Sequence, residues 1–445
     1  MKDADEVDLR LGAALVEATL FWPRWVHRRV DSVHVLEGEN GRRRQSIDCR
    51  PLDDARLAYT RSERDKVELA NVDGQIMIPL MYVTKGPLRH FDASKADGSP
   101  MPILGTRETA RCGVAMVVRM LHADRIEFAP ILAEALLHIA GPNVTSPADD
   151  AVVDLLERGL WRGKQVVHSQ ALSDQKSSVR SLIETLSASF LLVGLLDSSS
   201  ARARQILKIS YHWHIPAAEQ GWGRAVLIAA GFKKRRLRLQ PDAAAATSSY
   251  HLEVRTPREA QCVLLQLPGA EDGGGGVDAT GRPTAHVYMS FKEEPSEDAV
   301  AIFRTPLWGL RGAAVAVTLF CLVAIVLALT LDDAKGVWRA EPDGPATVLL
   351  VGPALFFTFL ASRGESALMR RPLTVLRLCI GGAGLSLLLI AASLVGRLDD
   401  GWIESLWIGM AVYNGVVAAF LLVGIVSEFM SVQKDRSGKA AKGQE

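Results

Sequence analysis

The stretch GAAVAVTLFCLVAIVLALTL, residues 312–331, decides the fold of this chain. It has no charged residue over about 20 positions, and a helix of that length crosses the roughly 30 Å hydrocarbon core of a bilayer. Three more apolar stretches follow it, at residues 345–361, 378–396 and 406–427. The first of these contains Pro353, which a membrane helix tolerates where a neighbouring helix or water satisfies the freed carbonyl. We therefore predict a four-helix transmembrane module over residues 312–428 and a basic tail over residues 429–445.

Basic residues flank the apolar stretches unevenly. The two ends of the module and the loop between its second and third spans hold Arg304, Arg311, Arg363, Arg370, Arg371, Arg377, Lys434, Arg436, Lys439 and Lys442. The other two loops hold Lys335, Arg339 and Arg397. Because Lys and Arg are retained on the cytoplasmic side, both termini are predicted to be cytoplasmic. The abundance of Arg and Ala suggests a GC-rich bacterial genome, so the expected location is a bacterial inner (plasma) membrane.

The composition excludes several classes of protein. The 51 Lys and Arg residues nearly balance the 50 Asp and Glu residues, so no net field draws the chain to nucleic acid. The five cysteines are scattered and form no CxxC pair, which argues against a disulfide framework or a zinc ribbon. The N-terminus, MKDADEVD, is acidic where a signal peptide is basic. The apolar run at residues 11–22 contains Glu17 and is expected to form an amphipathic helix of a soluble domain.

Residues 1–200 are predicted to form a cytoplasmic α+β domain. Turn residues separate alternating stretches between residues 30 and 105, which is typical of strands and hairpins. From Thr106 the apolar residues recur three and four positions apart, which predicts helices, with Gly141 and Pro142 ending the second of them. The segment SSVRSLIETLSASFLLVGLL continues the helical pattern and is expected to end as a strand.

Residues 205–304 are predicted to form a juxtamembrane antiparallel β-sandwich. Seven short segments in this region are strand candidates, namely ILKISYHWHI, RAVLIAA, RRLRLQ, YHLEVRT, QCVLLQL, AHVYMSF and AVAIFR. Short strands separated by turn-rich linkers are typical of such sandwiches. The fold class is thus an α+β soluble portion with a juxtamembrane sandwich, followed by a four-helix transmembrane module.

The segment SYHWHIP, residues 210–216, is the strongest candidate for chemistry. Its alternation places His212 and His214 on the polar face of a strand, opposite Tyr211 and Trp213. The pattern favours a half-exposed strand of ordinary structure. The alternative is a zinc site in which His251 on a neighbouring strand supplies a third ligand. No cofactor is otherwise expected, and none of the phosphate-loop, nucleophile-elbow or HExxH motifs occurs, so an enzyme is not the favoured class.

Two groups of charged or polar residues are candidates for other contacts. The cluster GFKKRRLRLQ is expected either to guard an exposed strand edge or to contact lipid headgroups or an anionic ligand through Lys233, Lys234, Arg235, Arg236 and Arg238. Arg42, Arg43 and Arg44 at a hairpin tip are expected to be solvated. Within the membrane, Asn414 is predicted to bridge two helices, and Arg377 to extend its charge to the bilayer surface.

These patterns favour a multi-pass membrane protein whose cytoplasmic domain senses a small ligand or docks a protein partner and acts on the membrane module. The expected partners are the lipid bilayer and that ligand or protein, without nucleic acid, and an oligomer of the chain is compatible with the spans. One alternative is a ligand-gated channel or transporter with a β-rich receptor domain. The other is a membrane-anchored metalloenzyme that uses the His212 region.

Overall fold

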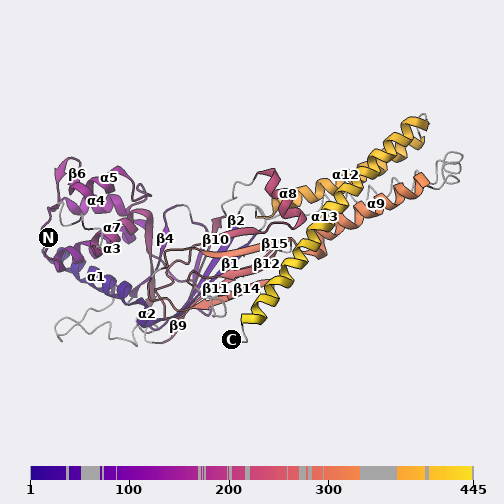
Figure 1. Ribbon diagram of the computed structural model, residues 1–445. Helices are drawn as coiled ribbons and strands as arrows, with labels where there is room; N and C mark the ends of the chain where they lie inside the picture. Colours follow the sequence, from indigo (N-terminus) through magenta and orange to yellow (C-terminus); the bar gives the residue numbers. More distant parts are fainter. Residues whose placement is uncertain are drawn as a thin grey trace.

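The fold is taken from a computed structural model in which the elements follow one another along an elongated molecule (Figure 1). The structure describes residues 2–36, 40–51, 71–72, 75–86, 88–168, 172, 174, 177–197, 199, 203–215, 221–257, 259–269, 277–278, 283–293, 295–330, 368–395 and 400–442. A helical lobe lies at one end, β-sheets occupy the middle, and long helices form the other end. The predicted span at residues 345–361 lies outside the described residues.

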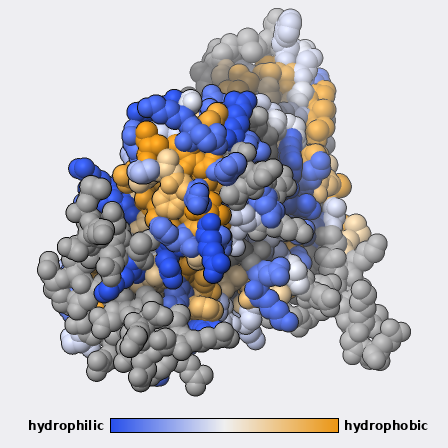
Figure 2. All heavy atoms as spheres, turned by 90° about the vertical axis from the view of Figure 1, so that its left-hand side faces the viewer, coloured by the Kyte–Doolittle hydropathy of each residue, from blue (hydrophilic) through white to orange (hydrophobic). Residues whose placement is uncertain are grey.

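The helical lobe has a core of its own. Its elements are α3 (Thr106–Ala123), α4 (Leu132–Ala140), α5 (Asp150–Val153), the π-helical turn η2 (Asp154–Arg158) and α7 (Ser178–Ala188), with the short strands β6 (Leu160–Trp161) and β7 (Lys164–Gln165). Helical spacing buries Val117 and Leu121 of α3 against α4 and α7. Seen from this end, apolar side chains gather at the centre of the face with hydrophilic ones around them (Figure 2). The helices predicted here are confirmed, including the stop at Gly141.

The largest sheet has six strands in the order β14-β11-β1-β2-β9-β5. These strands are β1 (Val26–Val35), β2 (Asn40–Cys49), β5 (Arg89–Ser94), β9 (Gln205–His214), β11 (Tyr250–Arg255) and β14 (Thr284–Met289). The predicted hairpin is confirmed, because β1 and β2 pair antiparallel. However, β1 and β11 run parallel, so the sheet is mixed. Strands on both sides of the predicted boundary at residues 200–205 therefore share one sheet.

Two smaller sheets cover different parts of this large one. The four-stranded sheet has the order β10-β15-β12-β13, from β10 (Arg235–Leu239), β12 (Gln261–Gln266), β13 (Val277–Asp278) and β15 (Ala299–Arg304). The three-stranded sheet has the order β3-β4-β8, from β3 (Asn71–Val72), β4 (Gln75–Thr84) and β8 (Ser189–Asp197). Val33 and Leu252 share an apolar core with Leu237 and Phe303 of the first. A second core joins residues of β1, β2 and β9 to β4 and β8, together with α1 (Lys2–Leu20) and α2 (Trp22–Trp25).

One predicted strand is wrong. The segment RAVLIAA lies in a helix, α8 (Trp222–Ala230), which buries Ala225, Ile228 and Ala229 at a helical spacing. Gly231 follows in the left-handed conformation at φ 94°, and its N–H donates to the carbonyls of Leu227 and Ile228. This arrangement is a standard helix end, because glycine adopts positive φ without a steric penalty.

Within the described residues, three helices are long and apolar enough to cross a membrane, which makes the chain a membrane-associated protein. They are α9 (Gly312–Thr330), α12 (Arg370–Val395) and α13 (Asp400–Lys442). The first residues of α9 and α12 join the core of the four-stranded sheet together with Leu421 of α13. Their far ends meet Ile403 and Trp407 near the start of α13. Consequently α9 and α12 leave the sheets in the same direction, and α13 returns toward them (Figure 1).

Candidate functional site

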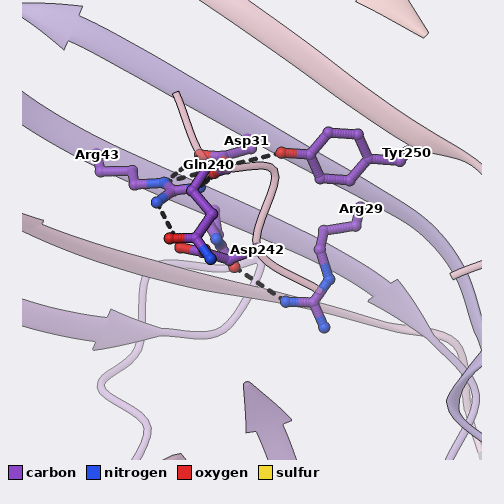
Figure 3. A network of polar contacts seen from close by, with 7 residues as sticks. Arg29, Asp31, Arg43, Gln240, Asp242 and Tyr250 are labelled. Carbon is purple, nitrogen blue, oxygen red and sulfur yellow. Dashed lines mark hydrogen bonds and ion pairs between the residues drawn. The ribbon is translucent and has the colours of Figure 1, made fainter. Parts of the chain in front are cut away.

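A buried ionic network lies on the inner face of the six-stranded sheet (Figure 3). Alternation along β1 turns Asp31 inward, where its carboxylate accepts hydrogen bonds from Arg43 of β2 and from the Tyr250 hydroxyl of β11 at 3.0 Å. Arg43 also donates to Asp242 Oδ2 at 2.5 Å and to the Gln240 carbonyl at 2.8 Å. Gln240 and Asp242 belong to the chain that follows β10. The network thus ties the end of β10 to the middle of the large sheet.

Charge pairing decides the protonation of this network. Burial alone would lower the pKa of Arg43, but Asp31 and Asp242 raise it well above its usual value, so Arg43 stays charged. Burial raises the pKa of Tyr250, and the neighbouring Asp31 adds to that effect. Tyr250 therefore remains a neutral hydrogen-bond donor, and the Asp31 carboxylate is held between a cation and a hydroxyl.

A pocket of about 670 Å³ opens beside the network. It lies where the ends of β4 and β10 approach β5 and β9, and a ligand of drug-like size fits a volume of this order. Its cationic lining residues are Arg43, Lys85, Arg89 and Arg238, and its acidic ones are Asp242 and Asp298. Its aromatic and large apolar residues are Val83, Leu88, Tyr211, Trp213 and Leu239. We call this space the basic pocket.

Lys85 and His212 of the basic pocket have lowered pKa values. Lys85 is buried and donates through Nζ to the carbonyls of Ile139 at 2.6 Å and Val144 at 3.0 Å, which joins the pocket to the helical lobe. Burial lowers the Lys85 pKa to about 8. Partial burial and the neighbouring His90 and Arg42 lower the pKa of His212. His212 is therefore neutral at pH 7, and the guanidinium groups supply the positive charge on this side.

A second buried ionic cluster connects the sheets to the membrane helices. Arg311 precedes α9, is fully buried, and forms an ion pair with Glu428 of α13. Arg304, the last residue of β15, donates to the other Glu428 oxygen at 2.8 Å and to Gln261 Oε1 at 3.0 Å. Arg311 also donates to the Ala230 carbonyl at the end of α8, at 2.5 Å. We call Arg304, Arg311, Glu428 and the Ala230 carbonyl the membrane joint.

Two glycines allow the close approach within the membrane joint. A Cβ atom on Gly424 of α13 would lie 2.0 Å from the Ala230 carbonyl oxygen. A Cβ atom on Gly231 would lie 2.2 Å from a terminal nitrogen of Arg311. One turn earlier on α13, Phe420 contacts Phe232 with ring centroids 5.3 Å apart. The end of α8 is therefore packed directly on the backbone of a membrane helix.

Strand β10 connects the two sites. It begins at Arg235, a few residues after the end of α8 in the membrane joint, and it ends at Leu239 in the basic pocket. Its five residues span about 17 Å at the usual rise of a strand. A displacement of β10 would therefore alter both sites together.

The histidines predicted as metal ligands are not brought together. His212 lies on β9 and His251 on β11, and β1 and β2 separate these strands in the sheet. His212 lies beside His90 with ring centroids 4.4 Å apart and the rings tilted by 45°, whereas His251 Nδ1 lies 3.1 Å from His286 Nε2. The side chain of His214 lies outside the described part of the chain. Among the described residues, no group of three or more metal-ligating side chains occurs.

The other predicted contact residues are divided between surface and core. Lys233, Arg236 and Arg238 are exposed and Lys234 is half-buried, but Arg235 is buried beside the start of α12. Burial and the charges of Arg224 and Arg371 lower the Arg235 pKa. Asn414 donates to Ser386 Oγ at 3.1 Å and so links α13 to α12. Arg377 is half-buried at the near end of α12, with its Nε atom inaccessible to solvent.

Sequence reasoning missed both ionic clusters. The expectation that Arg43 is solvated is wrong, because it pairs with Asp31 and Asp242. The available signal was Asp31 itself, a carboxylate on the apolar face of an alternating strand. For the membrane joint, the signal was Glu428, a carboxylate directly after an apolar span. A comparison with protein-family models finds no match for this chain, and no curated protein matches it.

Proposed function

We propose that the chain is a multi-pass membrane protein whose extramembrane part senses a ligand and passes its bound state to the membrane helices. The observation that carries this proposal is the path of β10, from the basic pocket to the membrane joint. The chain before β10 accepts a hydrogen bond from Arg311 at the Ala230 carbonyl, and the chain after it forms the ion pair of Asp242 with Arg43. A strand held at both ends in this way transmits displacement, because packed cores adopt discrete arrangements and deform little.

The energetic basis is the cost of separating buried charges. Arg311 is fully buried, and Glu428 is 7% exposed. Removing one partner of such a pair costs roughly 3–5 kcal/mol, because the other charge is left buried and uncompensated. The membrane joint therefore keeps the sheets and the membrane helices attached to each other.

Several finer features belong to this proposal. The six-stranded and four-stranded sheets share a core beside the membrane helices, which supports a sandwich in this position. Helix α9 begins beside the sheets and ends at the far end of the helices, whereas the described chain resumes at Leu368, again beside the sheets. The chain has to return between these two points, which supports a fourth crossing by residues 345–361. The basic flanks support cytoplasmic termini in a bacterial inner membrane.

Contact with lipid headgroups is also part of the proposal. Trp308, just before α9, is 98% exposed, and Trp222 and Phe232 at the two ends of α8 are exposed as well. Tryptophan is enriched at membrane surfaces, where its ring is apolar and its N–H remains hydrated. Lys233 follows Phe232 directly, so it lies at a height suited to anionic headgroups.

The test of coupling is amide hydrogen exchange on the purified full-length chain in nanodiscs. The Glu428→Gln variant is expected to speed exchange in α8 and β10 and in the pocket segment at residues 83–89. The matched control is Glu404→Gln, an exposed carboxylate on the same helix, which should leave these segments unchanged. If exchange rises at the membrane joint alone and the pocket segment keeps its wild-type rate, the pocket and the helices are independent and the proposal is wrong.

A further inference from the structure

The charge of the basic pocket is not balanced. Arg43 is compensated by Asp31 and Asp242, which hold it in the ionic network. Arg89 and Arg238 form no ion pair with any other described residue and are exposed.

Lys85 adds a third positive charge, and Asp298 is the remaining carboxylate of the lining. The positive charges therefore exceed the negative ones in a concave space, where low-dielectric walls strengthen the field on an anion.

The geometry of the strands brings positive groups together. Arg89 is the first residue of the edge strand β5 and the register partner of His212, so its side chain starts from the face of the sheet opposite Tyr211 and Trp213. The basic pocket includes residues of both faces around this end of the strand, which brings Arg89 and the two rings into one lining. Arg238 reaches the pocket from β10, and the ionic network fixes the chain that follows it. Guanidinium groups arriving from separate strands suit an anion with several oxygens, since each can donate two parallel hydrogen bonds.

The remaining walls of the pocket are apolar and aromatic. Tyr211 and Trp213 contribute rings, and Val83, Leu88 and Leu239 contribute aliphatic surface. The volume of about 670 Å³ leaves room for more than an inorganic ion. A ligand that matches both kinds of wall has a compact anionic group at one end and a flat or apolar body at the other.

We propose that the basic pocket binds an organic phosphate, a small molecule whose phosphate monoester lies between Arg89 and Arg238 and whose ring-bearing body packs on Tyr211 and Trp213. A phosphate monoester carries about 1.5 to 2 negative charges at pH 7, which matches the excess positive charge of the lining. This inference rests on the proposed function, for which the ligand is the signal. The source is a soluble metabolite, because the pocket lies at the end of β10 that is away from the membrane joint.

The test is calorimetric titration of the full-length chain in nanodiscs with adenosine 5′-monophosphate, adenosine and inorganic phosphate. The wild type is expected to bind the monophosphate more tightly than either fragment. The double variant Arg89→Ala and Arg238→Ala should lose on the order of thirtyfold or more in affinity, since two charge-assisted contacts are removed. The matched control is Arg28→Ala with Arg236→Ala, in which both arginines are exposed and lie outside the lining, and Arg236 shares the face of β10 with Arg238.

Two results would overturn the inference: no saturable binding of any probe at millimolar concentration, or equal affinity for the monophosphate in the double variant and its control. Melting temperatures of both variants check that they are folded.

Exchange at residues 304–312 and 424–430, followed with and without the monophosphate, separates the two proposals. Binding without a change in exchange supports the pocket and contradicts the coupling. Absence of binding, with pocket exchange still altered by Glu428→Gln, contradicts the pocket and supports the coupling.

Discussion

Asp31 shows how a single buried carboxylate organises the centre of the large sheet. It is fully buried, and it accepts from Arg43 and Tyr250, which come from the two strands adjacent to β1. A buried charge is tolerated only where hydrogen bonds and an opposite charge replace water. The Asp31 network therefore selects one register for β2 and β11 against β1, because a slip of one residue would turn these groups outward.

Replacing Asp31 by Asn is expected to lower the free energy of unfolding by about 3 kcal/mol, because Arg43 is left buried with Asp242 as its remaining partner. Tyr250→Phe removes one hydrogen bond and should cost about 1 kcal/mol. Urea titration of the full chain in detergent, followed by tryptophan fluorescence, measures both changes. The exposed Asp298→Asn variant is the control and should stay within about 0.5 kcal/mol of the wild type. Equal stability of Asp31→Asn and this control would show that the network contributes nothing.

Titration of Lys85 makes the free energy of unfolding depend on pH in the alkaline range. Its pKa falls from 10.5 to about 8 on folding because of burial, so the unfolded chain holds the proton that the folded chain releases between these values. Stability therefore rises with pH from about 8 to 10.5 through this group. Lys85→Met should reduce that rise, whereas exposed Lys164→Met should not. Melting temperatures recorded at pH 7 to 10 would contradict this origin if wild type and Lys85→Met shared one pH profile.

At the scale of single residues, burial pattern was predictable and pairing was not. The alternation of SYHWHIP correctly placed Tyr211 on the buried face and His212 on the more accessible one. The partner of each charged side chain depends on which strands become neighbours, and Arg43 meets Asp242 from a distant part of the chain. The sequence around Arg43 does not show this pairing, which is why Arg43 was wrongly predicted to be solvated.

At the scale of elements, α8 shows where prediction from hydrophobic periodicity fails. The segment RAVLIAA is short and almost wholly apolar, and such runs fit a buried strand and a buried helix equally well. The signals for a helix were Gly221 and Gly231, one at each end. Contact with α12 and α13 buries the segment on most sides, which removes the polar face that would have revealed its period.

The packing of α8 on α13 is expected to be sensitive to one methyl group. Gly424→Ala places a Cβ atom 2.0 Å from the Ala230 carbonyl oxygen, so α8 has to move away. The same change at Gly409 meets no atom within 4 Å and serves as the control on the same helix. We expect Gly424→Ala to lower the melting temperature in detergent and to speed exchange in α8, while Gly409→Ala does neither. Identical behaviour of the two variants would show that this contact is loose.

At the scale of the whole molecule, the prediction concerns orientation. Reporters active in the periplasm or in the cytoplasm, fused at the N-terminus, within residues 332–344 and after Glu445, should place both ends in the cytoplasm and the loop outside. The physical reason is the retention of Lys and Arg on the cytoplasmic side. An N-terminal reporter that is active outside would reverse the orientation and favour the receptor-channel alternative.

The membrane helices, the helical lobe and most strands could be predicted, because each shows its own periodicity or apolar length. Sheet membership could not be predicted. The sandwich was expected to use residues 205–304 alone, but β9 pairs with β2 and β11 pairs with β1. The basic pocket and the membrane joint both depend on such distant pairings, which explains why neither was anticipated from the sequence.

The membrane joint also implies an order of events during synthesis. Arg311 and Glu428 are 117 positions apart in the chain. At about 5–20 residues per second, the arginine leaves the ribosome roughly 6–23 seconds before its carboxylate partner. During that interval the Glu428 carboxylate is not there to compensate the charge of Arg311, so the guanidinium has to stay hydrated. The guanidinium is buried against Glu428 only after α13 has been made, so the sheets become joined to the membrane helices through this pair only when α13 is in place.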